Sequence, residues 1–132
     1  MSSGKRIVVV GAGAIGGYTG AHLARAGEDV TLVDAWPDHV EYVRAHGMQV
    51  SGVTPQETHT IKVPILHIGD VQRLTKEKPV DIVFICVKSY DTEWATHLMK
   101  SYVAPDAYFV SLQNCINEER IEIGRASCRE RV

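Results

Sequence analysis

The feature that most constrains this chain is a glycine-rich turn between an apolar run and a helical pattern. The turn spans residues 11–16 and reads Gly-Ala-Gly-Ala-Ile-Gly, which has the form G-x-G-x-x-G. The run before it, Ile7–Val10, is β-branched throughout and predicts a strand buried on both faces, as in a parallel sheet. Apolar residues then recur at three- and four-residue spacing over 14–26, which predicts a helix. This order of strand, glycine turn and helix favours an α/β fold.

Each glycine of the turn has a physical role. Gly11 lets the chain turn sharply off the strand, Gly13 has no Cβ to keep a diphosphate from the backbone, and Gly16 lets the helix sit close against the strand. The helix start at Ala14 and Ile15 presents unpaired N–H groups and a partial positive charge. These five residues form the predicted dinucleotide-binding turn. A glycine turn in some other α/β domain is the alternative.

An acidic residue, Asp34, closes the second predicted strand, 29–34, and follows Gly16 by eighteen residues. A carboxylate at this position can accept hydrogen bonds from the hydroxyls of the adenosine ribose. Its charge would repel a 2′-phosphate, so Asp34 favours NAD over NADP. The alternative is an acidic strand end that contacts nothing.

The rest of the chain alternates between strand and helix patterns. The expected strands cover 48–51, one or two antiparallel segments within 58–68, a central strand over 81–88, and 108–112. The expected helices cover 37–45, a polar stretch within 70–79, and a segment stopped by Pro105 in which Tyr90, Trp94, Leu98 and Tyr102 recur every four residues. This alternation predicts a Rossmann-type, doubly wound, mostly parallel sheet. The aromatic stripe of the last helix is expected in the core.

Composition narrows the class of partner. The 132 residues carry a net charge of −2, which disfavours nucleic acid and anionic membranes as partners. No apolar run approaches the ~20 residues of a membrane span. Cys86, Cys115 and Cys128 have no metal-site spacing and suit a reducing cytoplasm, with Cys86 expected as a buried thiol. His59 and His67 also form no recognisable metal site.

Three local patterns together carry a family resemblance: the glycine turn, Val87–Thr92 (Val-Lys-Ser-Tyr-Asp-Thr) and Leu112–Asn114 (Leu-Gln-Asn). Over about residues 5–121 the chain resembles the N-terminal domain of the ketopantoate reductase (2-dehydropantoate 2-reductase) family. The resemblance implies NADPH-dependent reduction of a 2-keto acid to a 2-hydroxy acid in pantothenate synthesis.

The resemblance also implies roles for two residues. Lys88 matches the family lysine that lies along the cofactor, and Asn114 matches the asparagine near the nicotinamide ribose and the substrate. The family's catalytic lysine and glutamate belong to a helical C-terminal domain, so no catalytic residue is expected in this chain. Two residues depart from the family pattern: Cys115 replaces a usual glycine, and Asp34 stands where many members have a basic residue. The cofactor can therefore be either NADP, as the resemblance implies, or NAD, as Asp34 favours.

The expected domain is partial and covers residues 1–121. Residues 122–132 match the translation of a common sequencing adapter, so we interpret them as a non-native tail. We expect an incomplete sheet, and no reductase activity from this chain alone. For the intact protein we expect a dinucleotide and a small 2-keto acid as ligands, and we leave a homodimer open. The alternatives are an NAD-sensing regulatory module without chemistry and a related dehydrogenase for another 2-hydroxy acid or an opine-like substrate.

Overall fold

The computed structural model describes residues 3–52, 54, 56, 58–76, 78–88 and 91–113. Within these residues a five-stranded sheet has the order β5-β2-β1-β6-β7, and every neighbouring pair of strands is parallel. The predicted Rossmann-type parallel sheet is therefore confirmed. Its strands are β1 (Arg6–Val10), β2 (Asp29–Asp34), β5 (Ile65–His67), β6 (Val80–Ile85) and β7 (Val103–Ser111).

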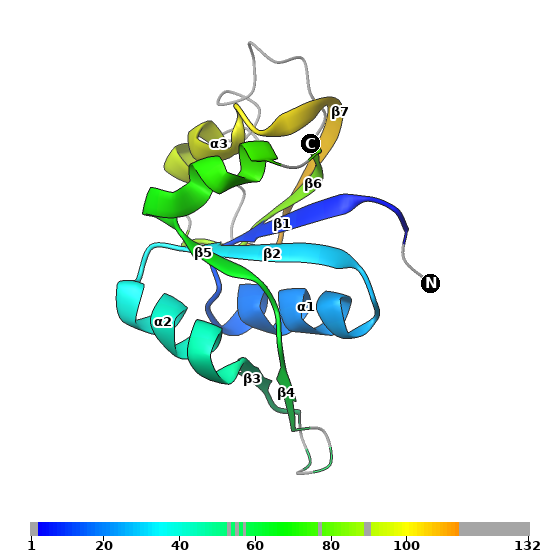
Figure 1. Ribbon diagram of the computed structural model, residues 1–132, viewed down its shortest axis with the longest axis vertical. Coiled ribbons are helices and arrows are strands. Elements are labelled where there is room, and N and C mark those ends of the chain that lie inside the picture. Colours follow the sequence, from blue (N-terminus) through cyan, green and yellow to red (C-terminus); the bar gives the residue numbers. More distant parts are fainter. Residues whose placement is uncertain are drawn as a thin grey trace.

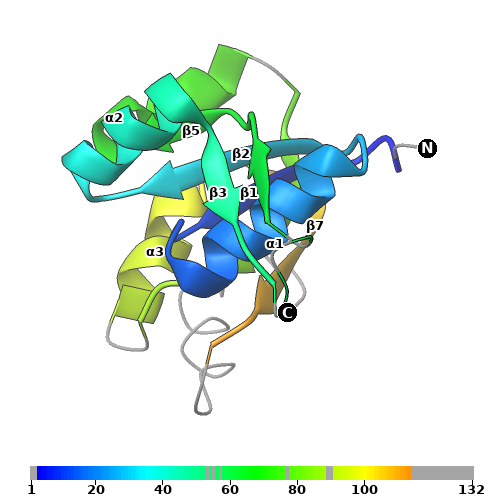
Figure 2. The same cartoon turned by 90° about the horizontal axis from the view of Figure 1, so that it is seen from below.

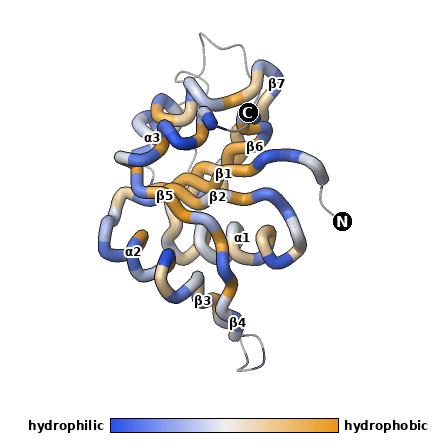
Figure 3. Tube along the Cα trace, in the orientation of Figure 1, coloured by the Kyte–Doolittle hydropathy of each residue, from blue (hydrophilic) through white to orange (hydrophobic). Residues whose placement is uncertain are grey.

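Helices cover both faces of this sheet (Figure 1). On one face lie α1 (Ala14–Arg25) and α2 (Pro37–His46), and on the other lie α3 (Thr92–Met99) and the 3₁₀ helix η2 (Ile68–Lys76). The residues of β1 alternate between the two cores: Val9 packs on the α1 side, whereas Val8 and Val10 pack on the α3 side. All five residues of β1 are buried, and burial on both faces explains the unbroken apolar run Ile7–Val10 that follows Arg6. Figure 3 shows the middle of the sheet as a band of hydrophobic residues.

The segment between α2 and η2 divides between two sheets. β3 (Met48–Val50) and β4 (His59–Ile61) pair in an antiparallel manner beside α1, as Figure 2 shows. The expectation of an antiparallel strand is thus confirmed for β4. It is wrong for β5, which joins the main sheet as a parallel strand, with Ile65 opposite Leu32 of β2.

The last predicted helix is shorter than expected and its stop signal was misassigned. α3 ends at Met99, and Pro105 lies inside β7 rather than at the end of a helix. Proline is tolerated there because β7 is one of the two outer strands of the described sheet, and its pairing with β6 is irregular between Val80 and Ile82. Tertiary placement of β7 therefore decides the role of this proline.

In the described part of the chain, no helix combines the length and the apolar character needed to cross a membrane.

Candidate functional site

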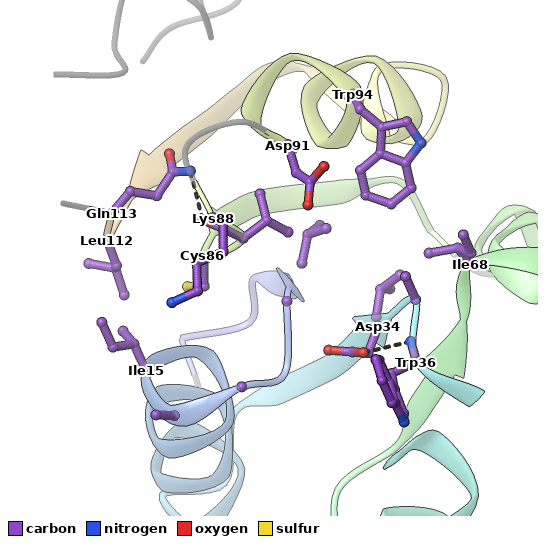
Figure 4. A pocket seen from close by; sticks show the side chains of 17 residues that line it. Ile15, Asp34, Trp36, Ile68, Cys86, Lys88, Asp91, Trp94, Leu112 and Gln113 are labelled. Carbon is purple, nitrogen blue, oxygen red and sulfur yellow. Dashed lines mark hydrogen bonds between the residues drawn. The ribbon is translucent and has the colours of Figure 1, made fainter. Parts of the chain in front are cut away.

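The five parallel strands end at the same edge of the sheet, and residues at or just after their ends line a cavity of about 590 Å³. Figure 4 shows this cavity from close by. The residues that line it come from the glycine turn after β1, the end of β2, the start of η2, the segment after β6, the start of α3 and the end of β7. Ligands of open α/β sheets bind outside the carboxyl ends of the strands, so this is the expected location of a cofactor.

The glycine turn forms one wall of the cavity and has little room for side chains. Gly11 has φ of +99°, and a Cβ there would lie 2.9 Å from backbone atoms of Cys86 and Val87. At Gly16 a Cβ would overlap the carbonyl oxygen of Gly11 and come within 3.0 Å of the Cys86 Cβ. Gly16 thus brings the helix close to the residue that directly follows β1 and to Cys86, which directly follows β6.

Gly13 differs from its neighbours because it borders open space. No heavy atom lies within 4 Å of the position that a Cβ would take. Gly13 is the N-cap residue of α1, it is exposed, and with Ala14 and Ile15 it lines the cavity. The N–H groups of the first helical turn have no intrahelical partners, so this wall is suited to an anion.

Asp34 links two loops at the edge of the cavity. Its Oδ2 accepts a hydrogen bond of 2.7 Å from the Ala12 N–H, and its Oδ1 accepts one of 2.8 Å from the Trp36 N–H. Asp34 therefore contacts the turn itself, and the alternative of an acidic strand end that contacts nothing is wrong. Each carboxylate oxygen has two lone pairs, so each keeps one acceptor site for a ligand hydroxyl.

The cavity's other side is formed after β6. Lys88 is exposed and lines the cavity with Cys86 and Asp91, on the side away from Asp34 (Figure 4). β2, which ends at Asp34, and β6, which precedes Lys88, flank β1 on opposite sides. An extended ligand that reaches from Asp34 to Lys88 must therefore cross the glycine turn.

Trp94 of α3 lines the cavity, which corrects the expectation that the aromatic stripe lies wholly in the core. The side chain is 41% exposed, and Figure 4 shows it at the cavity wall. Leu98 and Tyr102 of the same stripe do pack against the core. The spacing of four residues identified a helix face, but not that one end of the face leaves the core.

Sequence reasoning did not single out Gln113 by itself, although it stands within the Leu-Gln-Asn pattern. Its Nε2 donates hydrogen bonds to the Val87 carbonyl at 2.8 Å and to Thr92 Oγ1 at 2.7 Å. Its Oε1 accepts one from Ser111 Oγ at 3.0 Å. Gln113 thus joins the segment that carries Lys88 to the start of α3 and the end of β7. Asn114, Cys115 and Tyr90 lie outside the described residues.

A second residue that the sequence did not reveal is His39 of α2. Its Nε2 lies 2.7 Å from the carbonyl oxygen of Ala12 in the glycine turn. A carbonyl oxygen can only accept, so Nε2 carries the proton of this hydrogen bond. No sequence motif connects His39 to the turn, because the contact depends on how α2 packs.

Cys86, which the sequence predicts as a buried thiol, is partly buried and lines the cavity. Desolvation by burial raises the pKa of this thiol to about 11. Cys86 is therefore protonated at neutral pH and is a poor nucleophile. Among the residues that the structure describes, no group of three His, Cys, Asp or Glu side chains could hold a metal ion.

The family model for ketopantoate reductase PanE/ApbA matches residues 7–127. The chain belongs to the ketopantoate reductase family. Among curated relatives, the 2-dehydropantoate 2-reductase of Pyrococcus horikoshii is 36% identical over 121 residues, which cover 90% of this chain and 36% of that protein. The chain thus spans about a third of the length of this relative. The fold of the family agrees with the parallel sheet described above.

Two solved structures similar to this chain bear on the site. A PanE/ApbA family ketopantoate reductase from Ralstonia eutropha has a TM-score of 0.78 and 33% identity, and the match covers 100% of this chain and 40% of that one. A D-mandelate dehydrogenase solved with NADH and anilino(oxo)acetate has a TM-score of 0.73 and 29% identity, with 92% and 36% of the two chains covered. The ketopantoate reductase fold therefore also occurs in a dehydrogenase that binds NADH.

Proposed function

We propose that this chain is the cofactor-binding part of an NAD(P)H-dependent 2-keto-acid reductase, with 2-dehydropantoate as the preferred substrate. The observation that carries the proposal is the open space at Gly13, in a cavity bordered by the helix start on one side and by Asp34 and Lys88 on the others. A diphosphate needs both a close approach to backbone N–H groups and the absence of a side chain. Gly13 meets both requirements.

We further propose that NADH is preferred to NADPH. Asp34 is held by two backbone N–H groups, from Ala12 and Trp36. To admit a 2′-phosphate, the carboxylate would have to turn away and leave the N–H of the buried Ala12 unpaired, which costs about 1–3 kcal/mol. The N–H of Trp36 is exposed and can bond to water instead. If the carboxylate stayed in place, it would repel the phosphate. Lys88, the one basic side chain among the described residues that line the cavity, lies on the far side from Asp34.

The chemistry divides between this chain and the rest of the protein. When bound, a nicotinamide cofactor supplies the hydride that reduces a keto carbon. In this proposal Lys88 lies along the cofactor, and Asn114 contacts the nicotinamide ribose and the substrate, as the family resemblance implies. A general acid from sequence beyond this chain protonates the carbonyl oxygen. Residues 1–121 then form the cofactor domain, and residues 122–132 contribute nothing to it.

A related dehydrogenase for another 2-hydroxy acid is the second candidate. The D-mandelate dehydrogenase similar to this chain was solved with NADH and a 2-oxo acid derivative, and it shares 29% sequence identity. The part of the protein that would select the substrate is not included in this chain's match to its relatives. Asp34 does not distinguish the two reductases, because in both it would contact the adenosine ribose of the cofactor.

Two experiments test the proposal. Isothermal titration of the 132-residue chain should show NADH binding that is tighter than NADPH binding. The genomic reading frame beyond codon 121 should encode a helical domain with a lysine and a glutamate, and the protein it encodes should reduce 2-dehydropantoate faster than 2-oxo acids with an aromatic side chain. Absence of dinucleotide binding, or a frame that continues into a membrane channel, would refute a reductase.

A further inference from the structure

The carbonyl oxygen of Ala12 accepts a hydrogen bond from a side chain of a different element. His39 stands in the first turn of α2, twenty-seven positions away, and its Nε2 donates to the Ala12 carbonyl oxygen at 2.7 Å. The backbone N–H of Ala12 donates a hydrogen bond to Asp34 Oδ2 at 2.7 Å. Ala12 is itself 1% exposed, so both of its backbone polar groups are satisfied by side chains. Two consecutive peptide units of the glycine turn are thereby fixed.

The second of these units includes the N–H of Gly13. The peptide bond between Ala12 and Gly13 is trans, so its C=O and N–H lie in one plane and point in opposite directions. A donor that holds the carbonyl on the α2 side therefore turns the Gly13 N–H away from His39. Gly13 lines the cavity and borders open space. His39 thus determines the direction of an N–H group at the proposed diphosphate position.

The same hydrogen bond also affects the strength of the Gly13 donor. An amide whose carbonyl accepts a hydrogen bond is polarised, and its N–H becomes a better donor, because hydrogen bonds in a chain reinforce one another. An anion at the Gly13 N–H would in turn strengthen the bond from His39. The imidazole, the amide and the anion would form one continuous chain of hydrogen bonds.

Packing of α2 does not by itself require this bond. Val40 and Val43 of α2 are 1% and 3% exposed and anchor the helix in the core beside α1. Pro37 suits the first turn of the helix because it lacks the N–H that would be unpaired there. His39 is only partly buried, and its side chain donates a hydrogen bond to the glycine turn and not to its own helix.

We propose that His39 is a positioning residue, which orients and polarises the Ala12–Gly13 amide so that the Gly13 N–H binds the diphosphate of a dinucleotide. This inference rests on the proposed function, because it assigns the contact within the same cofactor site. It predicts that His39 acts on ligands with a diphosphate and not on ligands that only have the adenosine part.

The test compares three ligands: NADH, ADP-ribose and adenosine. Their affinities for the 132-residue chain are measured by titration calorimetry, with adenosine measured by displacement of ADP-ribose. His39→Leu removes the donor, and His39→Gln keeps an N–H at a similar reach. His46→Leu is the matched control, since His46 lies on the same helix and contacts only the Tyr42 carbonyl of its own helix in the described hydrogen bonds.

We expect His39→Leu to weaken NADH and ADP-ribose about tenfold, the effect of one lost hydrogen bond, with adenosine unchanged. His39→Gln should restore both affinities to within about threefold of the unmodified chain, and His46→Leu should change none of the three. Equal losses for ADP-ribose and adenosine would indicate a merely structural role and overturn the proposal. Unchanged ADP-ribose binding in His39→Leu would also overturn it.

Two controls keep the outcomes distinct. If His39→Leu does not fold, His39→Asn replaces it, because its amide is too short to reach the carbonyl; equal ADP-ribose affinity of the Asn and Gln variants would then overturn the role of His39. If the unmodified chain binds neither ADP-ribose nor NADH, the proposed function itself fails. Retained binding with no selective effect of His39 contradicts only this inference.

Discussion

A Cβ atom at Gly16 would overlap the carbonyl oxygen of Gly11, so these two glycines are in backbone contact across the turn. The contact brings the first turn of α1 against the end of β1. Gly13, between them in sequence, has no heavy atom within 4 Å of its own Cβ position. The three glycines of one motif therefore serve different purposes: two are required by the fold, and one leaves room for a ligand.

This difference predicts opposite results for two alanine variants. Gly16→Ala should lose about 1–3 kcal/mol of unfolding free energy, because the new methyl group displaces the backbone of the turn. Gly13→Ala should fold with unchanged stability and bind NADH at least about tenfold more weakly. Thermal unfolding by circular dichroism and titration calorimetry measure the two effects. A Gly13→Ala chain that binds normally would show that no ligand approaches this residue.

Replacement of Asp34 should change the choice between the two dinucleotides. Asp34→Asn removes the negative charge and one of the two acceptor atoms that hold the turn. We expect NADH affinity to fall about tenfold, as for a lost hydrogen bond to a charged group, and NADPH affinity to stay constant or rise. Asp38→Asn, an exposed residue at the start of α2, is the control. Tighter binding of NADPH than NADH by the unmodified chain would contradict the assignment.

Gln113 should stabilise both the fold and the cavity. Gln113→Leu leaves the Val87 carbonyl and the buried Thr92 without the donor that bridges them. We expect a loss of about 1–3 kcal/mol in denaturant unfolding, together with weaker binding of NADH. Gln72→Leu on the exposed face of η2 should lose less than about 0.5 kcal/mol. Equal stability of the two variants would argue against this bridge.

The raised pKa of Cys86 predicts how stability and thiol reactivity depend on pH. Its pKa of about 11 lies above the ordinary 9.0, so the folded state holds the thiol proton more tightly than the unfolded state. The resulting stability is complete below pH 9 and is lost as pH rises towards 11. Alkylation of Cys86 by iodoacetamide, followed peptide by peptide, should remain slow at pH 8 and speed up about tenfold per unit above it. Bound NADH should protect it, and a rate that levels off near pH 8 would contradict the raised pKa.

The parts of the fold that the sequence predicted well are those fixed by local chemistry. The glycine turn with its strand and helix depends on neighbours within a few residues, and Asp34 follows at the end of the adjacent strand. The apolar runs of β1 and β6 indicated parallel strands, because such runs are needed only where both faces are covered. Their position in the sheet then brought the predicted residues to one edge.

The remainder depends on tertiary packing that a linear pattern does not contain. Trp94 shares its spacing with Leu98, yet only the start of α3 reaches the cavity edge. His39 meets Ala12 because α2 packs beside the turn, and nothing in the sequence separates it from an ordinary surface histidine. Pro105 illustrates the same point, since a proline ends a helix or fits an outer strand according to its surroundings.

The end of β1 is tied to both of its neighbours, since the Gly11 N–H donates to the Val33 carbonyl at 2.8 Å and the Cys86 N–H donates to the Val10 carbonyl at 2.9 Å. The floor of the cavity is therefore continuous with the most protected part of the sheet. Amide hydrogens at Gly11 and Cys86 should exchange with solvent only through unfolding of the whole domain. The surface that binds the nucleotide would then be rigid before the ligand binds. Binding would therefore cost little conformational entropy of the protein.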